Sequence, residues 1–234
     1  MIREAPVKLR IAVVIPALNE ARAIAGTLKR IRAEEPDDLV VVDGGSVDKT
    51  GTQARNAGAR VINSHRGRGI QQNLGAASTL SEVLLFLHAD CHIEPGSLDD
   101  LRRFMNDHPG IAAGCFRMRV ESKGLMYKLI ETAADSRAAL LGIPYGDQGI
   151  FVRRKVFDRL GGFPEIPLME DVFFSLRLRG EGRIAVLPRR IFVSPRRWQS
   201  QGVIRQSLWN WALTIGAAAG VSPSHLARFY PHVR

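Results

Sequence analysis

Apolar runs alternate with helical patterns in the first part of the chain, and this alternation constrains the fold more than any other feature. The runs are residues 11–16, 39–43 and 83–87, which are dominated by Val, Ile or Leu, and the shorter apolar stretch in ARVIN, residues 59–63. The helical patterns between them cover residues 20–31, 47–57 and 69–78. Strands and helices alternating at this spacing predict βαβ units, with helices on both faces of a mostly parallel central sheet. Uniformly apolar strands fit a sheet covered on both sides. We therefore expect a Rossmann-like α/β fold.

The second part of the chain continues the pattern less regularly. Its predicted helices are residues 95–107, 125–141, 155–160, 170–179 and 202–218. Its predicted strands are residues 110–120, 149–154, 183–188 and 190–195, of which the last two are short and end in Pro. A chain of 234 residues can bury one sizeable α/β core and is short for two. Because no repeat or linker interrupts it, we expect a single domain over residues 1–234.

Positive charge is in excess and unevenly placed. The chain has 33 Lys and Arg against 23 Asp and Glu, a formal charge of +10. From Gly182 to Arg234 there are eight Arg and no acidic residue. This balance suggests an anionic partner, such as nucleotide phosphates, nucleic acid or an anionic membrane, although a solvated basic face would have the same composition.

No segment has the length of a transmembrane helix. The longest apolar stretch, residues 208–221, has 14 residues and contains Asn210, whereas a span needs about 20. The N-terminus lacks the apolar core of a signal peptide. The two cysteines, Cys91 and Cys115, form no CxxC pair, so no disulfide framework or zinc site is indicated. We expect a cytoplasmic protein, and the basic, apolar tail would allow it to touch a membrane.

Polar and small residues follow each of the first four predicted strands. Because ligands of open parallel sheets bind at the carboxyl ends of the strands, these residues are candidates for a binding site. They are Pro16, Ala17, Asn19 and Glu20 after the first strand, Asp43 and Gly44 after the second, Arg68, Gly69 and Asn73 after the third, and His88, Ala89 and Asp90 after the fourth. Together they offer the carboxylates, close backbone approaches and arginines that a nucleotide diphosphate with a divalent cation requires.

Asp90 ends the apolar run LLFL in a carboxylate flanked by histidines. Hard cations such as Mg²⁺ or Mn²⁺ often take one or two protein carboxylates and leave the other positions to phosphates and water. Asp90 suits this role. His88 could be a second ligand of the cation, a hydrogen-bond donor to a phosphate, or a packing residue. The alternative is that Asp90 only caps a turn.

Two other strand ends have structural alternatives. Asp43 stands where a base or ribose would be read, but DGGSVDKT also fits a turn followed by a capped helix, with Ser46 as the cap and Asp48 near the helix N-terminus. The segment RGRG, which contains Arg68, brings cations and glycines to a helix start, as phosphate binding requires, or is a flexible loop.

These loops together resemble the inverting family 2 glycosyltransferases, which have the GT-A fold. The matching segments occur in family order and are IPALNE, VDGGSVDKT, GRGIQQN, HAD in the place of the metal-binding DxD, MEDVFF in the place of the acidic motif with the catalytic base, and SPRRW in the place of a late Arg-Trp motif. His88 departs from the pattern, because it stands where the family has the first Asp of DxD. LHAD and GDQG further resemble a small stand-alone bacterial subgroup associated with radical-SAM or selenium-related gene clusters.

The resemblance implies a hexosyltransferase that moves a sugar from a UDP- or GDP-sugar to a hydroxyl with inversion. A divalent cation, Mn²⁺ or Mg²⁺, at Asp90 would bridge the diphosphate, and Arg68, Arg196 and Arg197 would add positive charge. The attacking hydroxyl needs a carboxylate base, for which we assign Asp171, with Glu170 as the alternative. Both acids would also favour a helix N-terminus without any catalytic role.

The same reading divides the chain into functional parts. Residues 1–95 would be the nucleotide-binding half, residues 96–200 the acceptor half, and residues 201–234 a basic helix and tail. We expect Asp147 and Gln148 of GDQG to line the sugar or acceptor side, where a polar turn is the alternative. Trp198 would stack on a sugar ring or fill the core.

Two other functions compete with this one. A sugar-phosphate nucleotidyltransferase usually has a Gly-rich, basic loop after its first strand, whereas PALNE has neither Gly nor Lys. A non-catalytic nucleotide or nucleic-acid binder would fit the charge, but acids at the strand ends repel phosphates unless a metal intervenes. We therefore expect no nucleic-acid partner. The acceptor could be lipid-linked at a membrane or a soluble small molecule.

Overall fold

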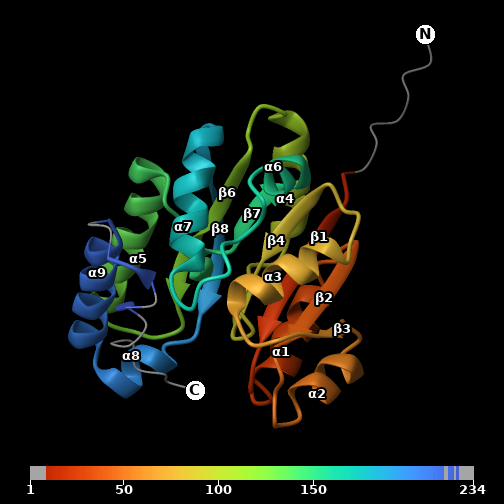
Figure 1. Ribbon diagram of the computed structural model, residues 1–234, viewed down its shortest axis with the longest axis horizontal. Coiled ribbons are helices and arrows are strands. Elements are labelled where there is room, and N and C mark those ends of the chain that lie inside the picture. Colours follow the sequence, from red (N-terminus) through yellow and green to blue (C-terminus); the bar gives the residue numbers. More distant parts are fainter. Residues whose placement is uncertain (1–8, 219–220, 224, 227–234) are drawn as a thin grey trace.

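The computed structural model describes residues 9–218, 221–223 and 225–226, without some of the side chains in the last two helices. It contains one eight-stranded sheet with helices on both faces (Figure 1). The strands are β1 (Ile11–Ala17), β2 (Asp38–Asp43), β3 (Arg60–Asn63), β4 (Val83–Phe86), β5 (Cys91–Ile93), β6 (Ala113–Val120), β7 (Ile150–Arg153) and β8 (Ile184–Val193).

The helices alternate with these strands along most of the chain. They are α1 (Ile24–Arg32), α2 (Thr50–Asn56), α3 (Arg68–Ala77), α4 (Ser97–Asp107), α5 (Leu125–Ser136), α6 (Arg154–Arg159), α7 (Glu170–Leu178), α8 (Arg196–Gln201) and α9 (Val203–Ala218). A π-helical turn, η1 (Arg137–Leu141), continues α5, and two 3₁₀ turns are η2 (Gly146–Gln148) and η3 (Arg179–Glu181). Within the described residues, no helix has both the length and the apolarity needed to cross a membrane.

The strands are ordered β3-β2-β1-β4-β7-β6-β8-β5 across the sheet. The first four pair in parallel, as does β6 with β8, whereas β7 is antiparallel to both neighbours and β5 is antiparallel to β8. The sheet is therefore mixed, and the predicted α/β class is confirmed. The carboxyl ends of β1, β2, β3 and β4 lie side by side, so the loops after them share one edge.

Apolar residues of the central strands alternate between two cores, one on each face of the sheet. Val13, Val41 and Leu85 belong to the first core, which α1 and α4 cover. Val14 and Phe86 belong to the second, to which α3, α6 and α7 contribute. Each such side chain contributes about 1.5–3 kcal/mol by burial. The two buried faces explain why these strands are apolar throughout.

The C-terminal strands differ from the sequence prediction. Residues 183–188 and 190–195 were predicted as two strands, whereas β8 is a single strand that runs through Pro188. Its pairing with β6 shifts register between Leu187 and Arg190, so Pro188 and Arg189 form a bulge. A bulge tolerates Pro because the missing N–H is not needed in the ladder there. The sequence analysis also missed β5 and α8.

Candidate active site

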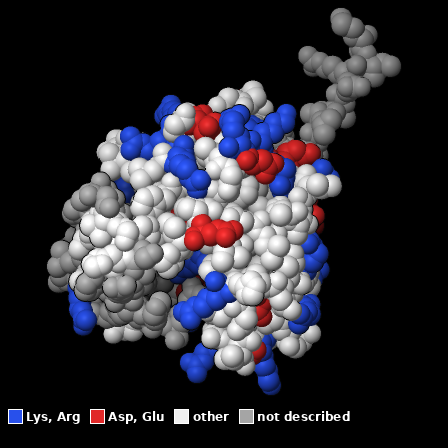
Figure 2. All heavy atoms as spheres, viewed as in Figure 1, with Lys and Arg blue, Asp and Glu red and all other residues white. Residues whose placement is uncertain are grey.

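The site lies at the edge of the sheet where the first four strands end. Figure 2 shows a hollow over this edge, with Lys and Arg side chains at its rim. The loop after β1 is tied to the loop after β2 by backbone-to-side-chain hydrogen bonds. Asn19 N–H donates to Ser46 Oγ at 2.9 Å, Val47 N–H donates to Asn19 Oδ1 at 3.0 Å, and Glu20 N–H donates to Thr50 Oγ1 at 2.8 Å. Asn19 adopts a left-handed backbone with φ +54°, which Asn tolerates better than most residues.

Asp43 and Gln71 fix the ends of β1 and β2. Asp43 Oδ1 accepts the N–H of Ser46 at 2.8 Å, so its carboxylate closes the turn that follows the strand. The Gln71 side-chain amide donates to the carbonyls of Ala17 at 2.9 Å and Val42 at 2.8 Å. Gln71 was not predicted, and a buried amide opposite two strand ends has no signature in sequence. Ser46 accepts from Asn19 and does not cap α2, which begins only at Thr50.

Several residues predicted to touch the donor are used inside the protein. Pro16 and Ala17 lie within β1, and the Ala17 carbonyl also accepts the N–H of Gly44. Ala89 is buried in the first core. Asn73 holds Phe163 with two hydrogen bonds, to its N–H at 2.8 Å and its carbonyl at 2.9 Å. In this conformation the predicted residues Pro16, Ala17, Gly44, Ala89 and Asn73 make contacts within the protein. They shape the strand ends and the loop before α7.

Arg68 forms an ion pair with Glu170 at the start of α7. Arg68 Nη1 lies 3.6 Å from Glu170 Oε1, and the Glu170 side chain is almost completely buried. Burial raises the pKa of Glu170, and the charge of Arg68 opposes that rise. Gly69 lies under the loop before α7, because a Cβ there would be 2.3 Å from the Pro164 carbonyl oxygen. The third strand-end loop is therefore joined to the acidic motif of α7.

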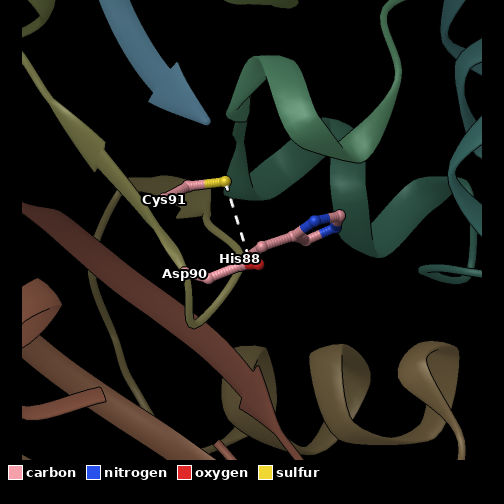
Figure 3. Close-up of side chains that lie close together, drawn as sticks. All are labelled: His88, Asp90 and Cys91. Atoms are coloured by element: carbon pink, nitrogen blue, oxygen red, sulfur yellow. Dashed lines mark hydrogen bonds between the residues drawn. The ribbon is translucent and has the colours of Figure 1, made fainter. Parts of the chain in front are cut away.

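His88, Asp90 and Cys91 lie together after β4 (Figure 3). One potential ligand atom from each lies within 4.8 Å of the others, and the Cys91 thiol is 3.9 Å from Asp90 Oδ1. The Cys91 side chain is buried in the first core, whereas His88 and Asp90 are partly exposed. An open carboxylate beside an imidazole fits a divalent cation that keeps most positions for phosphate and water oxygens. Asp90 and His88 would hold such a cation, and the core position of Cys91 fits packing.

Arg196 reaches the same carboxylate from the other end of the chain. Its Nη2 lies 3.5 Å from Asp90 Oδ2 and 3.2 Å from Glu20 Oε2. The guanidinium thus stands between two carboxylates at the strand ends, at a place that attracts positive charge. Arg197 is also in α8, but its side chain lies outside the described residues.

Asp171 lies close to His88, which in turn lies beside Asp90. Asp171 Oδ2 accepts the N–H of Gly146 at 2.7 Å, and Oδ1 accepts the N–H of Val172 at 2.8 Å. A Cβ at position 146 would lie 3.1 Å from Asp171 Oδ2 and 2.7 Å from His88 Nε2. His88 and Asp171 therefore meet around Gly146. The structure brings the predicted metal-binding and catalytic residues to one place.

Two residues that were expected to contact a ligand are buried, as the structural alternative for each requires. Gln148 has no exposed surface, and its Oε1 accepts a hydrogen bond of 2.8 Å from the Arg137 guanidinium. It therefore stabilises the η2 turn from inside the protein. Trp198 is buried in the first core, where its ring packs edge-on against Tyr127. The free energy gained by burying this large ring explains its position in the core, where it cannot stack on a sugar. Asp147 is in η2 and is partly buried.

Comparison with known protein families gives one match that covers most of the fold. The model of the family described as "Glycosyl transferase family 2" matches residues 12–162. The O-antigen chain rhamnosyltransferase RfbN of Salmonella typhimurium is 27% identical over 192 residues, which are 73% of this chain and 61% of that protein. The 4,4'-diaponeurosporenoate glycosyltransferase of Staphylococcus haemolyticus is 32% identical over 100 residues, or 39% of this chain and 27% of that protein. The chain thus spans less than two thirds of the length of these curated relatives.

Solved structures share the fold at low sequence identity. S. aureus TarS 1–349 aligns with a TM-score of 0.63 and 21% identity, covering 80% of this chain and 61% of that one. The mannosyltransferase PcManGT from Pyrobaculum calidifontis, in complex with GDP-Man and Mn²⁺, aligns with a TM-score of 0.63 and 21% identity, covering 80% and 57%. The likeness confirms the GT-A type of fold that the sequence predicted.

Proposed function

Because the chain belongs to glycosyl transferase family 2, we propose that it transfers a sugar from a nucleotide-diphosphate sugar to a hydroxyl acceptor with inversion at the anomeric carbon. Family membership favours this reaction over nucleotidyl transfer and over non-catalytic nucleotide binding. The observation that carries the proposal is the meeting of His88 and Asp90, Arg196, and Asp171, from three separate segments of the chain, at one edge of the sheet.

The donor diphosphate would bind on the side of Asp90. Asp90 and His88 would hold a divalent cation, Mn²⁺ or Mg²⁺, which when bound neutralises charge on the leaving diphosphate. Arg196 already lies beside Asp90, so a modest turn of its side chain would bring the guanidinium to a phosphate oxygen. Arg68 is paired with Glu170 and would contribute at longer range. The loops that carry Asn19 and Asp43 would contact the nucleoside.

Asp171 would act as the general base. The acceptor hydroxyl attacks the anomeric carbon, the bond from that carbon to the diphosphate oxygen breaks, and the hydroxyl proton passes to the Asp171 carboxylate. A single displacement of this kind inverts the configuration. Two backbone N–H groups orient the carboxylate before substrate binds. Glu170 is less suited, because it is buried and paired with Arg68.

The donor would be a UDP- or GDP-sugar. TarS was solved in complex with UDP-GlcNAc and with UDP, and PcManGT with GDP-Man and Mn²⁺. The acceptor would be a hydroxyl compound on the side of η2, the turn that carries Asp147. A soluble acceptor and a lipid-linked one both fit that position.

The test is donor turnover by the purified chain. UDP- and GDP-sugars are incubated with Mn²⁺ or with a chelator, and released nucleoside diphosphate is measured. The proposal expects Mn²⁺-dependent release from one of these donors, with loss of release in Asp90→Asn. Release that is independent of the cation and of Asp90 would refute the assigned donor site.

A further inference from the structure

Five large apolar side chains are exposed on one outward stretch formed by α5 and η1. They are Leu125, Met126, Leu129, Leu140 and Leu141, which we call the α5–η1 face. They make up half of the exposed large hydrophobic residues in the described part of the chain. Leu140 is 82% exposed and Leu125 is 73% exposed. Such gathering is unusual on the surface of a soluble domain and marks a contact site.

The opposite side of the same helix is already packed. Tyr127 and Ala134 lie in the first core, and Ala138 of η1 is fully buried. The helix thus buries Tyr127 and Ala134 and exposes Leu125, Leu129 and the charged Lys128. Large apolar side chains gathered on an exposed helix face favour contact with a second apolar surface. Figure 1 shows α5 at one end of the molecule, beside α9.

Charge on the face is positive. Lys123 and Lys128 are exposed at its N-terminal end. The acids of α5 turn inward, because Glu131 accepts from the N–H of Val120 at 2.9 Å and Asp135 accepts from the N–H of Met118 at 2.9 Å. Glu121, just before the helix, lies 3.8 Å from Arg30. The face therefore combines exposed leucines with lysines, and the acids of the helix do not point outward. Such a face complements a membrane whose interior is apolar and whose headgroups are anionic.

We propose that the α5–η1 face rests on an anionic membrane surface. Its leucines would enter the acyl boundary, and Lys123 and Lys128 would lie among anionic headgroups. A second copy of the chain fits less well, because a two-fold contact would pair the face with itself, and no acid of α5 would face Lys123 and Lys128. The helix lies on the membrane and does not cross it, as the finding on membrane-spanning helices requires.

The position of the face adds a consequence for the reaction. Arg137 of η1 donates to Gln148 in η2 at 2.8 Å, so the docked stretch and the acceptor-side turn are joined. A membrane contact would bring η2 toward the surface, where a lipid-carried hydroxyl could reach Asp171. This consequence alone rests on the proposed function, whereas the membrane contact needs no catalysis.

Vesicle flotation without donor or acceptor tests the contact. The full chain is mixed with vesicles of phosphatidylcholine containing about a third phosphatidylglycerol, or of phosphatidylcholine alone. We expect the wild type to float with the anionic vesicles, and the double variant Leu125→Glu, Leu129→Glu to lose at least about tenfold of its bound fraction. The double variant Lys123→Glu, Lys128→Glu should lose binding only to anionic vesicles. Leu80→Glu is the matched control, because Leu80 is 80% exposed in the loop between α3 and β4.

Thermal melts of each variant separate lost binding from lost folding. Light scattering after size exclusion gives the oligomeric state without vesicles. Wild-type protein that does not float, or an Leu125→Glu, Leu129→Glu variant that floats as well as Leu80→Glu, would overturn the proposal. A dimer that this double variant dissociates, together with absent flotation, would assign the face to a second copy instead. Failure of donor turnover would leave the flotation result unchanged.

Discussion

The backbone N–H of Gly146 donates a hydrogen bond of 2.7 Å to Oδ2 of Asp171, which lies at the start of α7. The contact joins η2 to α7 and sets the orientation of the carboxylate from outside its own helix. The other oxygen accepts from Val172 at 2.8 Å. In the proposed role of general base, a carboxylate held in this way would need little rearrangement when the acceptor arrives, which would lower the entropic part of the barrier.

Gly146→Ala is predicted to impair catalysis and to weaken cation-dependent donor binding. The added methyl would stand 2.7 Å from His88 Nε2 and 3.1 Å from Asp171 Oδ2, so both side chains must move. A displacement of this size lowers kcat by about 10- to 100-fold. Steady-state kinetics and donor titration measure the two effects. Gly110→Ala is the matched control, because a Cβ there meets nothing within 4 Å. Full turnover in Gly146→Ala would mean that the contact with Gly146 does not determine the orientation of the Asp171 carboxylate.

Asp171→Asn should abolish most turnover. The amide keeps the size of the carboxylate but cannot take a proton, so kcat should fall by about 10²- to 10⁴-fold with little change in donor affinity. Glu170→Gln is the comparison. Because Glu170 is buried against Arg68, its substitution should lower the melting temperature. The kcat of the protein that remains folded should change little. A larger loss of kcat in folded Glu170→Gln than in Asp171→Asn would reverse the two assignments.

Arg196→Ala is predicted to have opposite effects on cation and donor. The guanidinium lies 3.5 Å from the Asp90 carboxylate and therefore competes with a cation there. Its removal should strengthen binding of Mn²⁺ alone and weaken binding of the nucleoside diphosphate by about tenfold, the value of one charged hydrogen bond. Calorimetric titrations with each ligand measure both changes. Arg205→Ala, an exposed arginine of α9, is the control. If Arg196→Ala changed the affinities for Mn²⁺ and for the nucleoside diphosphate in the same direction, the proposed role of Arg196 would be wrong.

Asp48 should give the two strand-end loops a stability that depends on pH. Burial acts to raise the pKa of its carboxyl, but hydrogen bonds from Thr50 and Ala21 outweigh it and lower the pKa below the usual 3.8. The carboxylate therefore stabilises the fold above about pH 4, and this contribution disappears as the pH falls through the lowered value. Asp48→Ala should cost at most about 1 kcal/mol at neutral pH, because the group is exposed and screened.

Denaturant unfolding of wild type and Asp48→Ala between pH 7 and pH 3 measures this contribution. The difference in the free energy of unfolding should close toward the acid end. Asp107→Ala, at an exposed position in α4, is the control for substitution of a surface aspartate. A difference that is constant over the whole range would show that the interaction does not depend on ionisation.

The sequence analysis predicted the first half of the fold closely, because its strands are buried on both faces and its helices have clear periodicity. Residues such as Val13 and Val14 face different cores, which leaves a continuous apolar run. The prediction was wrong where pairing partners lie far apart in sequence. β8 passes through Pro188 only because β6 accommodates a bulge, and β5 exists only because β8 lies beside it. Neither relation has a local signal.

The candidate site shows the same division. Asp90 was proposed from its position after an apolar strand, and Asp171 from the resemblance of MEDVFF to the acidic motif of family 2 glycosyltransferases. The packing of their neighbours was not predicted, since the burial of Gln148 and Trp198 depends on α5, which is distant from η2 or α8 in sequence. Gln71 was missed because its partners, the carbonyls of Ala17 and Val42, are invisible to side-chain patterns. The sequence thus predicted candidate ligating and catalytic groups, but not the buried residues around them.

Cation-dependent nucleotide binding tests the central assignment most directly. Melting temperatures are recorded with UDP, GDP, CDP or dTDP, each with and without Mn²⁺, for the wild type, Asp90→Asn and Asp171→Asn. The site described here predicts that UDP or GDP with Mn²⁺ raises the melting temperature of the wild type and of Asp171→Asn, and that this rise is largely lost in Asp90→Asn. An equal rise in Asp90→Asn, or the same rise without the cation, would contradict it.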